Sequence, residues 1–353
     1  MSDASSTYVV EEEEYQTLTE EVITLRQGEE RWQGEYTNHY NWFYLNSPYP
    51  SKRIFTLRLE QQASPLIGTQ GLFTRNWKTD FGISKISVIG DMYVAKAHRT
   101  LGPALKLLRH VTDQACQDTD IIYSFPNKNA EPVFKRIGYK KVNDLTRYSR
   151  PLRCKEILQS HQKLKMLTPF SRLIDFCLFI ELHLRGFFTP NYNVDIQQPN
   201  EDELNDLWVD ANMHYSMIGK RDAAFIKWRL ANHTKNNTQL AIIRKQCDNT
   251  IQSYVIFETD AQGHIDIDDI LCRNGAKQLK SMLVAFLLYA YGKKIKTVSF
   301  VFSGNSEIKD TLSALRMHPR ESKPVYCYAS SSSPENALIN FARSVFITTA
   351  DQD

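Results

Sequence analysis

Apolar and polar residues alternate in several short segments of the chain, and this period of two predicts β-strands. Residues 54–59, 85–94, 239–244, 252–257, 264–271 and 297–302 have the pattern, and shorter strands are expected to start at Pro65 and to cover 121–125 and 325–328. In the longest of these, Ile86, Val88, Met92 and Val94 are expected on one face and Ser87, Ile89, Asp91 and Tyr93 on the other. The first thirty residues are acidic and favour helix instead.

Apolar residues at three- and four-residue spacing predict helices between these strands. The most regular helix is expected over 102–117, with others over 129–137, 200–213, 277–291 and 306–315. Gly138 follows the second of them, where a glycine typically ends a helix.

The same order of elements occurs twice along the chain. Each half has the order helix, hairpin, strand, helix, strand, helix, strand, although sequence identity between the halves is low. A chain of 353 residues is also long for one compact domain. We therefore expect an α/β protein with mixed (α+β) sheets and two similar domains, 1–153 and 195–353, joined by a helical connector over 154–194.

Charge and composition narrow the class of protein. Lys and Arg number 43 and Asp and Glu 40, a net charge of +3, which is too balanced for a protein that mainly binds nucleic-acid phosphates. The six cysteines form no C-x-x-C pair, so neither a metal site nor a disulfide framework is expected. The first residues lack a basic segment followed by an apolar one, and the expected location is the cytoplasm.

The longest apolar stretch covers residues 169–184. Arg172, Asp175 and Glu181 interrupt it, and a spanning helix needs about 20 mostly apolar residues, so no transmembrane helix is expected. Two interpretations remain: an amphipathic helix packed at an internal interface, or a surface helix that docks on a membrane or an acyl carrier.

The strongest local motif lies between the strand 85–94 and the helix 102–117. Arg99, Gly102 and Ala104 are spaced R-x-x-G-x-A. Small residues allow a ligand close to the backbone, and free N–H groups at a helix start bind phosphate oxygens. Pro103 suits the first helical turn, and Arg99 can add a charge-assisted contact. The motif indicates a phosphate-binding turn or, in the simpler interpretation, only the start of a helix.

With its surroundings, this motif resembles the GCN5-related N-acetyltransferase (GNAT) superfamily. In that family a strand ending in Val leads, five residues later, into R/Q-x-x-G-x-G/A, and Val94 and Arg99 keep this spacing. The family's next motif, N-x-x-A-x-x-x-Y-x-x-x-G-F, is matched in part by Asn127, Ala130, Phe134, Gly138 and Tyr139. The resemblance covers residues 30–152 well and residues 195–345 only in element order, so the whole chain resembles a tandem GNAT protein. Asn232-His233 and the closing segment 346–348 resemble the second half of bacterial tandem acyltransferases linked to envelope polysaccharide.

The resemblance implies an enzyme that transfers an acetyl or other acyl group from acyl-CoA to an amine. The acceptor would be a small molecule, such as an amino sugar or an envelope precursor. The pyrophosphate would lie on the amides of residues 98–104, the pantetheine arm would pair with residues 93–95, and an N–H group there would polarise the thioester. The residues expected to bind the cofactor are Tyr93, Val94, Ala95, His98, Arg99, Thr100, Leu101, Gly102, Pro103, Ala104 and Asn127.

Asp91 and Tyr93 are the candidate catalytic residues. Asp91 is either a general base, whose pKa a low-dielectric cleft would raise, or a structural carboxylate. Tyr93 either positions the acceptor and donates a proton or packs in the core. Where many GNAT enzymes have a Tyr that protonates the leaving thiolate, this chain has Phe134; Tyr123, Ser124 and Tyr139 are possible substitutes.

The second half lacks the phosphate-binding spacing, so we expect it to serve as a substrate wall or scaffold. Asp268 and Asp269 either serve in hydrogen bonding or recognition of the substrate amine or form a solvated edge, and Trp228 either caps a ligand pocket or anchors a helix. Two alternatives to the acyl-CoA enzyme are a non-catalytic binding module and a transferase whose donor is an acyl carrier protein or aminoacyl-tRNA.

Overall fold

The structure is a computed structural model that describes residues 8–27, 29, 35–60, 64–160, 165–196, 198–231, 237–330 and 334–352. The first half contains strands β1 (Tyr8–Glu13), β2 (Ser51–Leu59), β3 (Gly68–Thr79), β4 (Gly82–Val94), β5 (Ile121–Ser124) and β6 (Lys140–Pro151). Its helical elements are α1 (Thr19–Arg26), α2 (Tyr36–Tyr40), the π-helical turn η1 (Asn41–Leu45), the 3-10 turn η2 (Lys96–His98), α3 (Leu101–Asp118) and α4 (Glu131–Ile137).

A helical segment joins this half to the next. It consists of α5 (Lys155–Ser160), η3 (Lys165–Phe170) and α6 (Ser171–Phe187). The strands that follow are β7 (Tyr192–Ile196), β8 (Met217–Gly219), β9 (Thr238–Lys245), β10 (Ile251–Thr259), β11 (His264–Cys272), β12 (Thr297–Gly304), β13 (His318–Ala329) and β14 (Val345–Thr348). The helical elements are α7 (Glu201–Asn212), α8 (Ala223–Leu230), α9 (Ala276–Gly292), α10 (Ser306–Ala314), α11 (Pro334–Ser344) and η4 (Thr349–Asp351).

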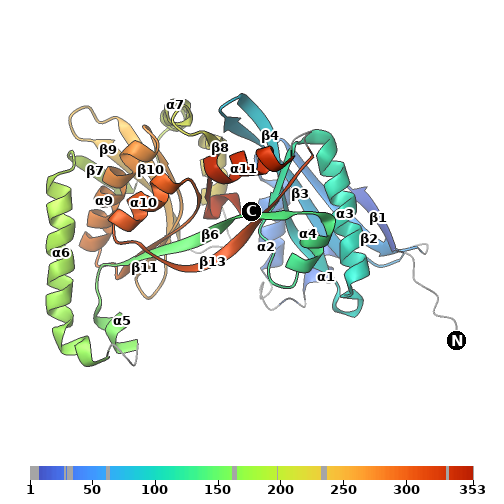
Figure 1. The fold of residues 1–353 in the computed structure, drawn as a ribbon, viewed down its shortest axis with the longest axis horizontal. Coiled ribbons are helices and arrows are strands. Elements are labelled where there is room, and N and C mark those ends of the chain that lie inside the picture. Colours follow the sequence, from blue (N-terminus) through green and yellow to red (C-terminus); the bar gives the residue numbers. More distant parts are fainter. Residues whose placement is uncertain are drawn as a thin grey trace.

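One continuous mixed sheet runs through the molecule (Figure 1). Its main path has the order β1-β2-β3-β4-β5-β13-β6-β12-β11-β10-β9-β7, and β8 and β14 lie off this path. The predicted α/β class with a mixed sheet is confirmed. The order is equivalent when followed from either end. From one end, five strands of the first half (β1 to β5) are followed by β13 of the second half, and from the other end, five strands of the second half (β7 and β9 to β12) are followed by β6 of the first half.

The two central strands are therefore exchanged. β6 of the first half pairs antiparallel with β12, from Thr297 opposite Pro151 to Phe302 opposite Thr146. β13 of the second half pairs antiparallel with β5, with Tyr326 opposite Ser124. A backbone hydrogen-bond ladder thus joins residues on both sides of position 153, so the halves share one sheet.

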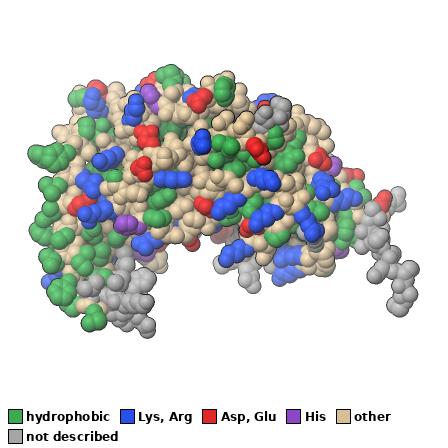
Figure 2. All heavy atoms as spheres, in the orientation of Figure 1, with side chains coloured by type: hydrophobic (Ala, Val, Ile, Leu, Met, Phe, Trp, Pro, Cys, Tyr) green, Lys and Arg blue, Asp and Glu red, His purple; other side chains and the backbone are tan. Residues whose placement is uncertain are grey.

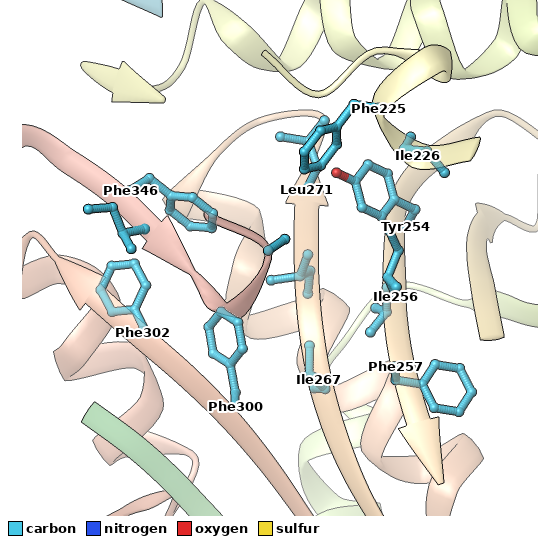
Figure 3. Packing of buried hydrophobic residues seen from close by; sticks show 14 of the residues in the cluster. Phe225, Ile226, Tyr254, Ile256, Phe257, Ile267, Leu271, Phe300, Phe302 and Phe346 are labelled. Carbon is cyan, nitrogen blue, oxygen red and sulfur yellow. The ribbon is translucent and has the colours of Figure 1, made fainter. Parts of the chain in front are cut away.

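Two apolar cores cover the sheet. The smaller core lies between α3, α4 and the first-half strands, whereas the larger core extends through both halves. Figure 3 shows part of the larger core, with Phe300 and Phe302 of β12, Ile267 and Leu271 of β11, and Phe346 of β14. Packing along this continuous core stabilises the arrangement that the exchanged strands impose.

The N-terminal segment is helical only in part, because α1 (Thr19–Arg26) follows a strand. Residues 8–13 form the edge strand β1, which pairs antiparallel with β2. Glu12 and Glu13 form ion pairs with Arg53 and Arg58 across the two strands. These cross-strand pairs are tertiary interactions, and they override the local preference of an acidic sequence for helix.

The expected alternation along β4 is interrupted at a β-bulge. Asp91 has a φ of 53°, and the register with β3 shifts at this point. Ile86 and Val88 consequently pack in the larger core, whereas Met92 and Val94 pack with the smaller one. The prediction that these four residues share a face is wrong, because one extra residue in the strand reverses the alternation beyond it.

Candidate functional site

Strands β4 and β5 run side by side over a short distance and then separate. Their described pairing stops at Val88 and Tyr123. From Gly90 to Val94, β4 pairs only with β3 within the described part of the chain. The edge of β4 that faces β5 is therefore without a strand partner there, and an extended ligand can form hydrogen bonds with it.

The backbone amides of the turn after β4 fall into two groups. The N–H groups of His98, Arg99 and Thr100 donate to protein carbonyls at 2.7–3.3 Å. The N–H groups of Leu101 and Gly102 belong to the first turn of α3 and have no acceptor within the helix, and Thr100 provides no side-chain cap. Of the amides expected to bind pyrophosphate, those at the start of α3 are thus the available ones.

Gly102 leaves open space beside these amides. A Cβ atom added to Gly102 would meet no protein atom within 4 Å. Packing inside the described protein does not require a glycine here, whereas a phosphate group approaching the helix start would need the space. This geometry fits an anion at the first turn of α3, with Pro103 as the one residue there that has no N–H group to offer.

The side chains around the turn are partly occupied. Arg99 donates from Nε to the carbonyl of Val94 at 2.9 Å, and its guanidinium carbon lies 5.1 Å from the centre of the Tyr93 ring. The remaining guanidinium N–H groups of this exposed residue can contact a ligand. His98 interacts through Nδ1 with the Tyr8 hydroxyl at 3.2 Å, which ties the turn to β1.

Asn127 lies on the other side of the separation, after β5. Its Oδ1 accepts hydrogen bonds from the N–H groups of Asn129 and Ala130, both at 3.0 Å. This turn leads into α4, where Phe134 is buried against the Tyr139 ring at a centroid distance of 5.0 Å. The two motifs of the sequence therefore lie at the ends of the two separating strands.

The three proposed substitutes for the missing tyrosine all have protein partners. The Tyr139 hydroxyl is buried 3.0 Å from that of Thr112, and burial raises the pKa of Tyr139. Tyr123 donates to the carbonyl of Asp351 at 3.2 Å, and Ser124 donates to a β4 carbonyl at 2.8 Å. Each hydroxyl group is therefore already engaged in holding the fold together.

Asp91 lies in a buried cluster whose other members the sequence did not indicate. Its Oδ1 accepts from Arg26 at 2.9 Å, and its Oδ2 accepts from the hydroxyl groups of Tyr36 at 2.8 Å and Tyr44 at 3.0 Å. Burial, together with the charge of Asp91, raises the pKa of both tyrosines, so they remain protonated donors. Burial alone would lower the pKa of Arg26, but Asp91, Tyr36 and Glu29 raise it on balance. The cluster fastens α1 and α2 to the bulge in β4.

Tyr93 connects this cluster to the turn. Its ring centre lies 4.7 Å from the guanidinium carbon of Arg26 and 5.1 Å from that of Arg99. Cations near an aromatic ring are attracted to its π electrons, so Tyr93 holds both arginines beside the bulge. Its hydroxyl group makes no hydrogen bond to the described residues, which leaves it available to a ligand.

Comparisons with known proteins bear on this geometry. No family model matches the chain, and no curated protein matches its sequence. A GCN5-related N-acetyltransferase from Anabaena variabilis is similar in structure, with a TM-score of 0.63 and 14% identity over 96% of this chain and 75% of that one. An Enterococcus faecalis protein described as a probable N-acyltransferase is also similar, with a TM-score of 0.62 and 13% identity over 92% of this chain and 73% of that one.

This chain has the GNAT fold.

A third similar structure is Saccharomyces cerevisiae N-myristoyltransferase with bound myristoyl-CoA, with a TM-score of 0.54 and 10% identity over 93% of this chain and 84% of that one. In the GNAT fold of the present chain, the sequence motifs lie on the two separating strands of the first half. The resemblance inferred from them is therefore confirmed for the fold.

The second half of this GNAT fold uses its acidic residues internally. Asp269 is fully buried and accepts hydrogen bonds from Arg221, Tyr254 and Thr348 at 2.6–3.0 Å. Asp268 is also buried and pairs with Arg229 at 3.2 Å. The alternative of a solvated edge is wrong for both carboxylates, because both are buried. Their guanidinium partners compensate the cost of removing these charges from water.

Trp228 joins the two halves. Its ring stacks on that of Trp42 with a centroid distance of 4.5 Å and an interplanar angle of 7°. Each indole N–H donates to the backbone carbonyl of the other residue, at 2.8 and 2.9 Å. The structure thus shows Trp228 anchoring α8 to η1. Asn232 and His233 lie outside the described residues.

A second buried ion-pair cluster lies between the halves. Asp351 of η4 forms ion pairs with Arg75 of β3 and Arg221 of the second half. Burial alone would raise the pKa of Asp351, but the two guanidinium groups lower it on balance. The described residues contain no group of three or more side chains suited to a metal ion, and none of their helices is long and apolar enough to span a membrane.

Proposed function

We propose that this protein is an acyl-CoA-dependent N-acyltransferase that acts on a small amine. The observation that carries the proposal is the open edge of β4 beside the uncapped first turn of α3. The two features lie next to each other along the chain, so one extended thioester nucleotide can occupy both. The acyl-transferase names of the structural neighbours agree with this interpretation.

The chain offers groups for each part of such a substrate. The N–H groups at the start of α3, those of Leu101 and Gly102, would hold the diphosphate with help from Arg99. The backbone of residues 93–95 would pair with the pantetheine arm, although the Ala95 N–H already donates to the Ile67 carbonyl at 2.7 Å. Acyl-CoA itself supplies a thioester carbon that an amine can attack.

The reaction balances without a covalent enzyme intermediate. The amine nitrogen forms a bond to the thioester carbon, the carbon–sulfur bond breaks, and the amine loses a proton to solvent water. A backbone N–H near the bulge would stabilise the negative charge that develops on the carbonyl oxygen. Phe134 cannot protonate the departing sulfur, so coenzyme A would leave as a thiolate and take its proton from water.

For Asp91 we propose a positioning role. Both carboxylate oxygens accept hydrogen bonds from Arg26 and two tyrosines, so neither is directed freely at an acceptor. Asp91 would then hold the bulge in place, and Tyr93, whose hydroxyl is available, would contact the acceptor or the thioester. The acceptor class that we favour is an amino sugar or a related envelope precursor, in line with the sequence resemblance.

A non-catalytic module that binds acyl-CoA is the second candidate. The engagement of Tyr139, Tyr123 and Ser124 in internal hydrogen bonds favours it, because none of these three hydroxyl groups is free to replace the missing acid.

Two measurements test these functions. Native mass spectrometry of the purified protein, with and without added acetyl-CoA, should show a one-to-one complex. Release of free thiol from acetyl-CoA should then rise when a panel of amines and amino sugars is added. Binding without amine-dependent release would support the binding module, and the absence of any complex would exclude both functions.

A further inference from the structure

Helix α6 exposes a continuous apolar stripe along one edge of the molecule. Its members recur at three- and four-residue spacing on one side of the helix and continue just beyond its end: Leu173, Phe176, Ile180, Leu184, Phe187 and Phe188. Their side chains are between 40% and 83% exposed. Figure 2 shows apolar side chains gathered along the edge where Figure 1 places α6.

The opposite side of α6 holds the helix on the protein. Leu182 is buried, and a Cβ atom on Gly186 would lie 2.7 Å from Leu288 of α9. The Phe179 ring packs at 5.4 Å from that of Tyr291, also on α9. Since α6 is already fixed through this inner side, the apolar stripe does not contribute to packing within the described chain.

The stripe is large for an exposed surface. At about 150–250 Å² for a large aromatic side chain, its six members present roughly 700 Å² of apolar surface to solvent. The largest exposed patch of a typical monomer measures about 300–600 Å² and is often functional. A surface of this size and continuity indicates that something covers it.

Positive charge borders the stripe. Arg172 and Asp175 lie one turn apart on α6; Arg172 is exposed, whereas Asp175 accepts a hydrogen bond from the N–H group of Cys154 at 2.6 Å. Glu181 and Arg185 line the same surface hollow as Ile180, Leu184 and Phe188, and Glu181 lies within ion-pair distance of three guanidinium groups, those of Arg150, Arg185 and Arg316. The uncompensated charge along this edge is therefore positive.

We propose that α6 docks this protein on the surface of a lipid bilayer that contains anionic lipids. A helix lying in the plane of the interface buries its apolar side about 5–10 Å deep, and flanking cations then contact the negative headgroups. Pairing two copies through the same stripe would instead bring their positive borders together, which charge repulsion opposes. A planar anionic surface satisfies both the apolar and the charged parts of this edge. This proposal is independent of the acyl-transfer function.

Vesicle flotation of the full chain tests the proposal. The protein should float with vesicles of phosphatidylcholine and phosphatidylglycerol, and less of it should float with phosphatidylcholine alone. The double variant Leu184→Ser, Phe187→Ser should bind the anionic vesicles at least about tenfold more weakly, because two of the inserted side chains are lost. Arg172→Glu should weaken binding to the anionic vesicles only.

The matched control is Phe81→Ser. Phe81 is 96% exposed but lies at the β3–β4 turn, away from α6, so its replacement should leave flotation unchanged. Thermal melting of each variant establishes that it is folded. The proposal is overturned if the wild type does not float with anionic vesicles or if the folded double variant floats equally well. A dimer in sedimentation velocity that the double variant dissociates, without vesicle binding by the wild type, would instead assign the stripe to a second copy and likewise overturn it.

Discussion

Replacing Gly102 with alanine separates ligand binding from folding at the proposed diphosphate site. The added methyl group would meet no protein atom within 4 Å, so it introduces no clash in the unliganded protein. Alanine also favours helix over glycine by about 0.5–1 kcal/mol, and position 102 lies in the first turn of α3. We therefore expect the free energy of unfolding of Gly102→Ala to equal or slightly exceed that of the wild type.

The effect on coenzyme A binding should have the opposite sign. The methyl group occupies the space through which a phosphate reaches the first amides of α3. Loss of one charge-assisted hydrogen bond costs about 1.5–3 kcal/mol, which corresponds to a Kd that is roughly 10- to 150-fold higher. Isothermal titration calorimetry with coenzyme A measures the affinity, and chemical denaturation measures the stability.

Gly292→Ala provides the matched control. Gly292 is also helical, at the end of α9, and a Cβ atom there would likewise meet nothing within 4 Å. Its substitution should leave the coenzyme A affinity unchanged. If Gly102→Ala binds coenzyme A with the affinity of the wild type, the diphosphate does not lie on the first turn of α3, and the proposed orientation of the substrate is wrong.

Two further predictions concern the buried ion-pair clusters. Asp91→Asn should lower the free energy of unfolding by about 3 kcal/mol, because Arg26 loses its buried counter-charge. The acidic limb of the pH–rate profile should keep its midpoint in this variant, and a shifted midpoint would identify Asp91 as the general base. Asp351→Asn should destabilise the protein by about 3–5 kcal/mol near neutral pH. Because the folded-state pKa of Asp351 is lowered, the stabilisation is present above the ordinary value of 3.8 and is lost as the pH falls through the folded-state pKa. Denaturation at about pH 3 should therefore show a smaller difference between variant and wild type, and a constant difference would contradict the ionic origin of the effect.

The sequence was most informative where the determinants are local. The motif from Arg99 to Ala104 marks the turn between β4 and α3, and Asn127 marks the turn before α4, because glycine, proline and asparagine impose local backbone preferences. The amphipathic spacing of α3 gave its position for the same reason. These local patterns were sufficient to indicate the GNAT fold.

The surroundings of Asp91 could not be inferred in this way. Arg26 is 65 residues away in sequence, and it closes a short helix in an acidic segment without any distinctive spacing. The bulge was likewise not predicted, because its residue Asp91 is a non-glycine residue in a left-handed conformation and the alternation of apolar and polar residues does not indicate such a conformation. Tertiary contacts determine both features, so the role of Asp91 depends on partners that only the structure brings together.

The exchange of β6 and β13 shows why a repeat in the sequence did not reveal how the halves are joined. The pattern of apolar residues shows that a strand is present but not which strand lies beside it, because strands pair through backbone groups that every residue type shares. In the structure β13 occupies the place beside β5, and β6 lies between β13 and β12. The Trp42–Trp228 stack and the ion pairs of Asp351 also connect the two halves. The second half lacks the phosphate-binding motif, but its strand β13 pairs with β5 and so completes the sheet of the first half, which contains the proposed site.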